Sequence, residues 1–279
     1  MPSSRFAYMP LITYPDAASD SSVEAAAELA KVIGAELHAT TFVVEIPRAS
    51  TSIGGLLLNM PEMIRITVEN SKARCRQFEA LLTEKAGAHA KVQCSTRQSQ
   101  PALTADTAAS ESRYFDVVLL PWSKGSPAVS DFAQAVVFGS GRPSILVPPG
   151  ITSEPVKNVA IAWDASRVAA RALADLMPLL ADDCQITVLT VEDEKPLPDN
   201  GIAEALASSL RKRGYRAEAQ TVALHGRKIA QALQEAALNS GVQILAMGGF
   251  GHSRVRDFVL GGATMGVFDD LRLPVLLSH

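Results

Sequence analysis

The sequence has little cysteine and no long apolar run. Its three cysteines, Cys75, Cys94 and Cys184, are far apart and no C-x-x-C occurs, so neither a zinc site nor a disulfide framework is indicated. No apolar stretch approaches the roughly 18 residues of a membrane span, and residues 1–6 lack the apolar core of a signal peptide. We therefore expect a cytoplasmic protein with reduced thiols and no membrane partner.

Neither sign of charge dominates the chain. It has 26 Lys and Arg against 29 Asp and Glu, which gives a formal net charge of −3 and a pI near 6.0. The chain has no excess of positive charge that would attract nucleic acid or an anionic membrane, so no nucleic-acid partner is expected. Aromatic residues are scarce, at 5%, and alanine is abundant. That composition favours helices packed on a sheet over a β-sandwich.

The usual catalytic motifs are also missing. The sequence contains no G-x-x-x-x-G-K-(S/T), G-x-S-x-G, H-E-x-x-H or G-x-G-x-x-G. His252 and Ser253 are adjacent in sequence, and neighbours of this kind rarely form a nucleophile–base pair. The histidines show no metal-ligand spacing either. We therefore predict no catalytic residues and no metal-ligating residues.

What the sequence does contain is one order of elements that occurs twice. Pro148-Pro149-Gly150 breaks regular structure near the middle, which predicts domains at residues 1–150 and 151–279. In the first half we expect strands at 11–14, 36–44, 90–95, 116–121 and 144–147, and helices at 22–33, 63–86, 101–111 and 128–138. In the second we expect strands at 156–164, 185–191, 216–224, 242–248 and 274–277, and helices at 168–180, 202–213, 229–238 and 255–271. Such alternation predicts two doubly wound, Rossmann-like α/β domains, each with a five-stranded parallel sheet.

A glycine-rich segment follows the buried strand expected at residues 242–247. Residues 247–254 read MGGFGHSR, and residues 261–264 read GGAT. Glycines after a strand let backbone N–H groups approach a phosphate closely, and the start of the next helix adds its positive dipole end. In doubly wound sheets, ligands lie beyond the carboxyl ends of the strands, where Asp164 is also expected. These features predict a nucleotide phosphate site.

The spacing of these glycines resembles a known family signature. Gly248-x-x-Gly251, followed after nine residues by Gly261, looks like the G-x2-G-x9-G-(S/T) motif of the universal stress protein family. The resemblance extends to the strand that ends at Asp164 and to Pro274-Val275 in the last strand. Because both halves share the element order, the chain resembles a tandem universal stress protein over nearly all its length.

This resemblance implies a binding role for particular residues in the second half. Asp164 would contact the ribose, Val191 would line the adenine pocket, and Met247 and Gly248 would lie beside the ribose and first phosphates. The phosphate chain would be surrounded by Gly251, Gly261, Gly262, Ala263 and Thr264. The implied ligand is ATP, or ADP or AMP, accompanied by Mg²⁺. One departure is Gly262, where the family prefers Ser or Thr, so a hydroxyl donor is lost that Thr264 replaces only in part.

The first half departs further from the family pattern. Its corresponding strand is followed by Pro121-Trp122-Ser123-Lys124-Gly125, with no Gly-x-x-Gly. Trp122 would place bulk where a phosphate needs bare backbone. Asp16 corresponds to Asp164, with Asp20 as an alternative because the loop lengths differ. Residues 139–141 (GSG) are expected to end a helix. We predict one competent site and one degenerate copy.

Several alternatives stay open at this point. Asp164 could simply cap the helix that follows it. Residues 225–228 (HGRK) bring cations to a helix N-terminus, which hints at a nearby anion. Residues 52–60 are apolar and loop-like and could pack at an interface. The last strand of each half is an apolar edge, so the halves could pair as an intramolecular pseudo-dimer, and two chains could associate further.

The resemblance implies an ATP-binding regulatory protein of the stress response with little or no turnover. The main alternative is a dimerisation or partner-binding module of the same fold that has lost the nucleotide. A third hypothesis is a hydrolase or transferase of the wider adenine-nucleotide-binding α/β superfamily, although no motif positions a general base.

Overall fold

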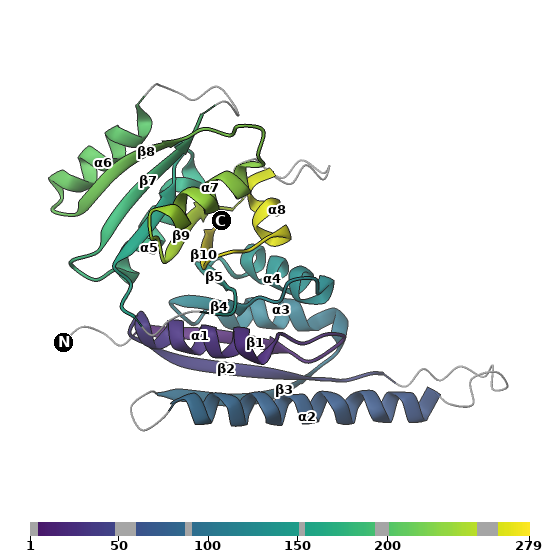
Figure 1. The fold of residues 1–279 in the computed structure, drawn as a ribbon. Helices are drawn as coiled ribbons and strands as arrows, with labels where there is room; N and C mark the ends of the chain where they lie inside the picture. The colour runs from purple at the N-terminus through teal and green to yellow at the C-terminus, as the bar shows by residue number, and fades with distance from the viewer. Residues whose placement is uncertain (1–4, 48–59, 87–90, 151–153, 193–200, 250–261) are drawn as a thin grey trace.

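The computed structural model describes residues 5–47, 60–86, 91–150, 154–192, 201–249 and 262–279 (Figure 1). Within these residues, ten strands form one sheet in the order β3-β2-β1-β4-β5-β10-β9-β6-β7-β8. The last five strands repeat the order of the first five in reverse. Each half of the chain therefore contributes an equivalent block, and the doubly wound α/β class predicted from the sequence is confirmed.

The strands and helices alternate along the whole chain. The strands are β1 (Arg5–Ile12), β2 (Ala35–Val44), β3 (Val92–Ser99), β4 (Val117–Pro121), β5 (Ser144–Val147), β6 (Asn158–Ala162), β7 (Gln185–Val191), β8 (Arg216–Val222), β9 (Ile244–Gly248) and β10 (Val275–Ser278). The helices are α1 (Asp20–Val32), α2 (Met60–Ala86), α3 (Pro101–Ser112), α4 (Pro127–Ser140), α5 (Arg167–Leu176), α6 (Ile202–Lys212), α7 (Ile229–Asn239) and α8 (Gly262–Asp269). Within each block all neighbouring strands are parallel.

Most boundaries agree with the sequence predictions to within two residues, and β5 and β7 match them at both ends. The strand predicted at 90–95 is shifted, since β3 spans Val92–Ser99, and the predicted start of the last helix at residue 255 lies outside the described residues. The first strand was predicted wrongly to begin at Leu11 and to reach residue 14. In the structure β1 begins at Arg5 and continues through Pro10. The ladder to β4 ends at Tyr8, so the missing N–H of Pro10 falls beyond it. The helix predicted to reach residue 180 ends at Leu176, where a 3₁₀ turn containing Pro178 follows.

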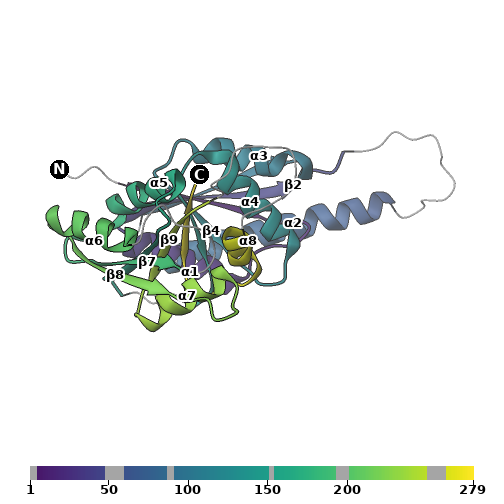
Figure 2. The same ribbon diagram turned by 90° about the horizontal axis from the view of Figure 1, so that it is seen from above.

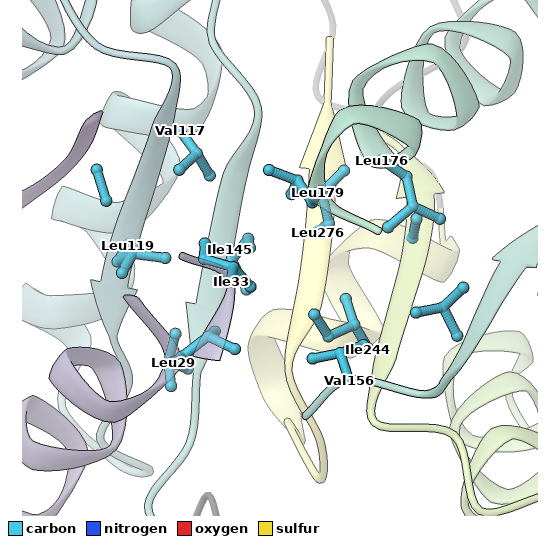
Figure 3. Packing of buried hydrophobic residues seen from close by; sticks show 14 of the residues in the cluster. Leu29, Ile33, Val117, Leu119, Ile145, Val156, Leu176, Leu179, Ile244 and Leu276 are labelled. Atoms are coloured by element: carbon cyan, nitrogen blue, oxygen red, sulfur yellow. The ribbon is translucent and has the colours of Figure 1, made fainter. Parts of the chain in front are cut away.

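The two blocks meet where β5 pairs antiparallel with β10. Leu146 lies opposite Val275 and Ile145 lies opposite Leu276. Every residue of both strands is buried. The sequence predicted that these apolar edges would be covered, and pairing removes both of them from solvent. Figure 3 shows Ile145 and Leu276 on either side of this seam, within one continuous cluster of apolar side chains.

Helices cover both faces of the sheet. One face packs against α1, α2, α5 and α6, with Phe78 of α2 and Leu176 of α5 fully buried there. The other face packs against α3, α4, α7 and α8, with Val136 of α4 and Val267 of α8 fully buried. Each cluster runs through both halves of the chain. Burial of this kind is the main source of stability for such a layered fold.

Helix α2 extends beyond the sheet that it packs on, as Figure 2 shows. Its C-terminal part is anchored by Phe78 and Leu82, which are fully buried. Nearer its start, Met60, Met63 and Ile66 are exposed. No helix within the described residues has both the length and the apolar character needed to cross a membrane.

Candidate functional site

The predicted site lies at the carboxyl ends of three neighbouring strands in the second block. β6 pairs with β7 on one side and with β9 on the other. The chain leaves β6 toward β7 and later returns to the opposite side as β9, so this is a point where the strand order reverses. Ligands of doubly wound folds bind at such points. Asp164 follows β6, Val191 ends β7, and Met247 and Gly248 end β9.

Gly251 and Gly261 lie outside the described residues, as do His252 and Arg254. Gly262, Ala263 and Thr264 are described and form the first turn of α8. The structure therefore brings together the strand-end residues and gives the start of α8, whereas the glycines between them stay predictions from the sequence. Residues 52–59 are likewise outside the described part of the chain.

Asp164 shapes the loop between β6 and α5. Its Oδ1 accepts a hydrogen bond of 3.0 Å from the backbone N–H of Ser166, and Ala165 between them has a φ of 60°. This left-handed conformation is uncommon for a residue with a side chain, and the Asp164 hydrogen bond stabilises it. The helix cap is Ser166, whose Oγ accepts from Ala169 N at 3.2 Å. The capping role suggested for Asp164 is therefore wrong, because Ser166 is the cap.

Val191 and its neighbours fix the position of the β7 end. Val191 lies opposite Val222 of β8 and is half-buried. Beside it, Thr190 is buried and its hydroxyl donates to the carbonyl oxygen of Trp163 at 2.9 Å. The N–H of Trp163 in turn donates to Leu189 O at 2.8 Å. These bonds continue the β6–β7 pairing to the point where the chain turns toward Asp164.

Gly248 is required by packing against α5. A Cβ at this position would lie 2.6 Å from Val168 Cγ2, 2.7 Å from the carbonyl carbon of Val168 and 2.8 Å from Ala169 N. Two of those atoms are backbone, which cannot move aside without shifting the helix. The first glycine of the motif thus allows the N-terminus of α5 to approach β9 closely. That structural reason holds with or without a ligand.

The start of α8 is the open part of the site. Gly262 is exposed, and no atom of the described residues lies within 4 Å of the position that a Cβ would take. The first N–H groups of a helix have no partner within it and carry the positive end of its dipole, which favours an anion. Thr264 is only 3% exposed. Its side chain is therefore turned inward, and its partial replacement of the hydroxyl that Gly262 lacks stays a prediction.

Arg227, one of the cations before α7, has partners of its own. Arg227 Nη1 lies 2.6 Å from Glu235 Oε2, and its other nitrogens donate to Leu224 O and Ala223 O. Hydrogen bonds from Gln231, Arg227 and Arg272 lower the pKa of Glu235 to about 2. Glu235 is the anion that the cationic sequence around Arg227 indicated. This segment therefore gives no independent support for a phosphate site.

The corresponding region of the first half is closed by side chains. Five residues, 122–126, connect β4 to α4, whereas thirteen residues of the sequence, 249–261, separate β9 from the first described residue of α8. Trp122 is 4% exposed and packs edge-on against Phe268 of α8, with ring centroids 5.6 Å apart. The backbone N–H of Trp122 donates to Val147 O. A large buried indole thus occupies the position after the strand, as the sequence predicted.

The two aspartates proposed as counterparts of Asp164 differ in their surroundings. Asp16 lies in the loop between the first strand and the first helix, as Asp164 does, and Ser126 Oγ is 3.4 Å from its Oδ2. Asp20 is the first residue of α1 and forms an ion pair of 2.7 Å with Arg74. Position in the fold therefore assigns Asp16 as the counterpart. The helix end predicted at residues 139–141 is confirmed, since Gly141 has a φ of 68°.

Two residues that the sequence did not single out connect the halves near this site. Phe268 contacts Trp122, and Asp270 forms an ion pair with Lys124 at a distance of 3.0 Å. No sequence signal predicts such contacts, because the partners are more than 140 residues apart. The described residues contain no group of three or more His, Cys, Asp or Glu side chains suited to a metal ion.

Comparison with known proteins identifies the class of this fold. The sequence model of the universal stress protein family matches residues 155–279, which include the whole second block. A universal stress protein of Synechocystis sp. is 28% identical over 176 residues, which are 58% of this chain and 57% of that protein. The match thus spans little more than half of the relative's length.

Solved structures share the fold over nearly the full chain. A universal stress protein from Archaeoglobus fulgidus superposes with a TM-score of 0.66 at 15% identity, and the alignment covers 97% of each chain. A functionally unknown protein from Pseudomonas aeruginosa PAO1 gives a TM-score of 0.53 at 12% identity, covering 97% of this chain and 92% of that one. The second half of this chain, residues 155–279, thus matches the universal stress protein family, and the fold of the whole chain is that of the solved universal stress protein from Archaeoglobus fulgidus.

Proposed function

We propose that this protein binds an adenine nucleotide in its second half and acts as a stress-response regulator with little or no turnover. The observation that carries the proposal is the open N-terminus of α8 at Gly262, in the same block as the three strand ends where the sheet order reverses. The match of residues 155–279 to the universal stress protein family supports it. The ligand is ATP, ADP or AMP.

Each group near the strand ends has chemistry suited to one part of the nucleotide. The carboxylate of Asp164 accepts hydrogen bonds, as ribose hydroxyls require. The half-buried Val191 offers an apolar contact to a base. The N–H groups of Gly262 and Ala263 suit phosphate oxygens. Mg²⁺ would be held mainly by the phosphates, because the described residues provide no cluster of carboxylates for it.

The same proposal covers the organisation of the chain. Residues 1–150 and 151–279 are two domains of the family fold, and the β5–β10 pairing makes them an intramolecular pseudo-dimer. Only the second domain binds nucleotide, because Trp122 closes the first. We place the protein in the cytoplasm. Two chains could associate further, and sedimentation velocity measures that directly.

Gly262→Asp tests the nucleotide site. An acidic residue in the first turn stabilises a helix by about 0.3–1 kcal/mol, and the position is open, so the variant should fold normally. The same carboxylate would oppose a phosphate, and we expect the affinity for Mg·ATP in isothermal titration calorimetry to fall about tenfold or more. Wild-type protein that releases no heat with Mg·ATP, or Gly262→Asp that binds equally well, would contradict the proposal.

The first half offers a matched control. Ser126 caps α4 through a hydrogen bond from Val129 N, and Asp is an equally good cap, so Ser126→Asp places the same charge at the corresponding helix start. We expect no change in nucleotide affinity. Gly262→Ser restores the hydroxyl that the family motif prefers, and we expect the affinity to rise a few fold, about the effect of one neutral hydrogen bond.

One observation favours a second candidate function. The packing of Gly248 against α5 explains that glycine without any ligand, which is consistent with a partner-binding module that no longer binds nucleotide. Native mass spectrometry of the purified protein separates the two. A retained adenine nucleotide would contradict the hypothesis of a partner-binding module without nucleotide. Ligand-free protein that also gives no heat with Mg·ATP would favour that hypothesis.

A further inference from the structure

Helix α8 is short and has a different role at each end. Its first residue, Gly262, is exposed at the proposed phosphate site, and Phe268, near its last residue, is buried against the first half. At 1.5 Å per residue, the two positions are about 9 Å apart along the helix axis. The helix therefore spans the distance between the proposed site and the other half of the molecule. Figure 1 shows α8 beside α4.

The far end of α8 contacts the connection that replaces the phosphate loop in the first half. The rings of Phe268 and Trp122 meet edge-on at 5.6 Å, with an angle of 61° between their planes. Lys124 Nζ lies 3.0 Å from Asp270 Oδ1, just past the end of the helix. The same connection, residues 122–126, also binds α1, because Ser123 Oγ accepts from the N–H of Ser19.

The body of α8 is packed so closely that it cannot shift by itself at one end. A Cβ on Gly266 would lie 2.6 Å from Ala230 Cβ of α7, and Val267 is fully buried. Cores of this density transmit displacement, since there is no free volume to absorb it. Asp270 also pairs with Arg272, and Arg272 pairs with Glu235 of α7. These ion pairs hold the end of α8 and α7 together.

We propose that nucleotide occupancy at the start of α8 changes the Trp122–Phe268 and Lys124–Asp270 contacts, so that the first half responds to the ligand state of the second. This inference rests on the nucleotide site proposed above. A phosphate bound to the first N–H groups moves the short helix as a unit, and its far end repacks against residues 122–126. Because coupling between two sites is reciprocal, altering the far contacts changes nucleotide affinity by the same factor.

The chain provides its own reporter for this coupling. It has two tryptophans, Trp122 at the contact and Trp163 directly before Asp164. Trp163→Phe removes the one beside the proposed ligand and leaves Trp122 as the sole source of tryptophan emission. Titration of this variant with Mg·ATP, with calorimetry in parallel, should give an emission change that saturates with the heat. Heat without an emission change overturns the coupling and leaves the nucleotide site intact, whereas no heat overturns both.

A second variant tests the ion pair. Lys124 is largely exposed and lies outside the proposed binding residues, so Lys124→Met should preserve the fold while removing the pair with Asp270. We expect its Mg·ATP affinity to change about threefold, the size of effect expected for the loss of one exposed ion pair. Lys31→Met, which removes an exposed pair with Glu28 in α1, is the matched control and should leave affinity unchanged. Equal affinities in the two variants overturn the coupling.

Discussion

The carboxyl ends of the two blocks differ far more than the blocks themselves. Both have the same strand order and two helices on each face, yet five residues join β4 to α4, whereas thirteen residues of the sequence separate β9 from the first described residue of α8. The short connection carries a buried Trp122, and the long one leads to an exposed Gly262. The comparison teaches that the topology of the sheet sets where a ligand site can lie, at the carboxyl ends of the strands. The residues that follow the strand then determine whether side chains fill that position.

The largest expected effect comes from truncating the residue that closes the first half. Trp122→Ala removes a buried indole and its contact with Phe268, and we expect the free energy of unfolding to fall by about 3–5 kcal/mol in urea titrations. We also expect no second nucleotide site, since the connection stays short. A calorimetric stoichiometry that rises from one to two nucleotides per chain would show that Trp122 alone separates the halves.

Trp163→Ala is the control from the second half. Trp163 is only half-buried, so we expect a loss of about 1–2 kcal/mol. Equal losses in the free energy of unfolding for the two variants would mean that Trp122 is packed no more tightly than Trp163. The proposed difference between the two halves would then be wrong.

The next largest effect is a difference in stability between alanine substitutions at two glycines of the same motif. Gly248→Ala forces a methyl group against the backbone of Val168 and Ala169, and we expect a loss of about 2–3 kcal/mol. Gly262→Ala meets open space, so stability should stay the same or rise by up to about 1 kcal/mol. Urea denaturation of both variants measures the difference. Similar destabilisation by both would show that packing does not distinguish them.

A smaller effect compares the two aspartates after the first strand of each block. Asp164→Ala removes the 3.0 Å hydrogen bond to Ser166 N, which we expect to cost about 1 kcal/mol in the free energy of unfolding. Asp16 makes a weak contact of 3.4 Å with Ser126, so Asp16→Ala should cost less than about 0.5 kcal/mol. Calorimetry should show lost nucleotide affinity in the first variant alone, and a parallel loss in the second would contradict the proposed asymmetry.

The smallest effect is a pH dependence in the second half. Hydrogen bonds from Gln231, Arg227 and Arg272 lower the pKa of Glu235 from 4.5 to about 2. The native state therefore holds the charged form more strongly than the unfolded state does. Its stabilisation is complete above pH 4.5 and is lost as the pH falls toward 2. The difference in Tm between wild type and Glu235→Gln should be constant from pH 7 to 5 and shrink below pH 4.5.

The first half has the opposite pH dependence. Burial raises the pKa of Tyr8 from 10.0 to about 12, since the phenolate would be desolvated. The stability linked to its neutral form is complete below pH 10 and is lost as the pH rises toward 12. The Tm of Tyr8→Phe should therefore fall less than that of wild type over this alkaline range. Identical alkaline profiles would show that Tyr8 does not titrate differently in the native state.

Local sequence predicted most of the elements because their signals are local. Apolar runs such as 144–147 and 185–191 became β5 and β7 without change, and Ser166 capped its helix through its own side chain. The errors also had local causes. The start of β1 at Arg5 was missed, and the sequence does not show that the β1–β4 ladder ends at Tyr8, before Pro10. The capping role considered for Asp164 belongs to Ser166, two residues further on.

The sequence by itself determined the fold class, the duplication and the location of the candidate site, because hydrophobic periodicity and turn residues act over a few neighbouring positions. Only the tertiary structure decided how the halves join, why Gly248 must be glycine and how the end of α8 meets Trp122 and Lys124. Those features depend on contacts between segments that are far apart in the chain, and they are decided by close packing, which no local pattern encodes.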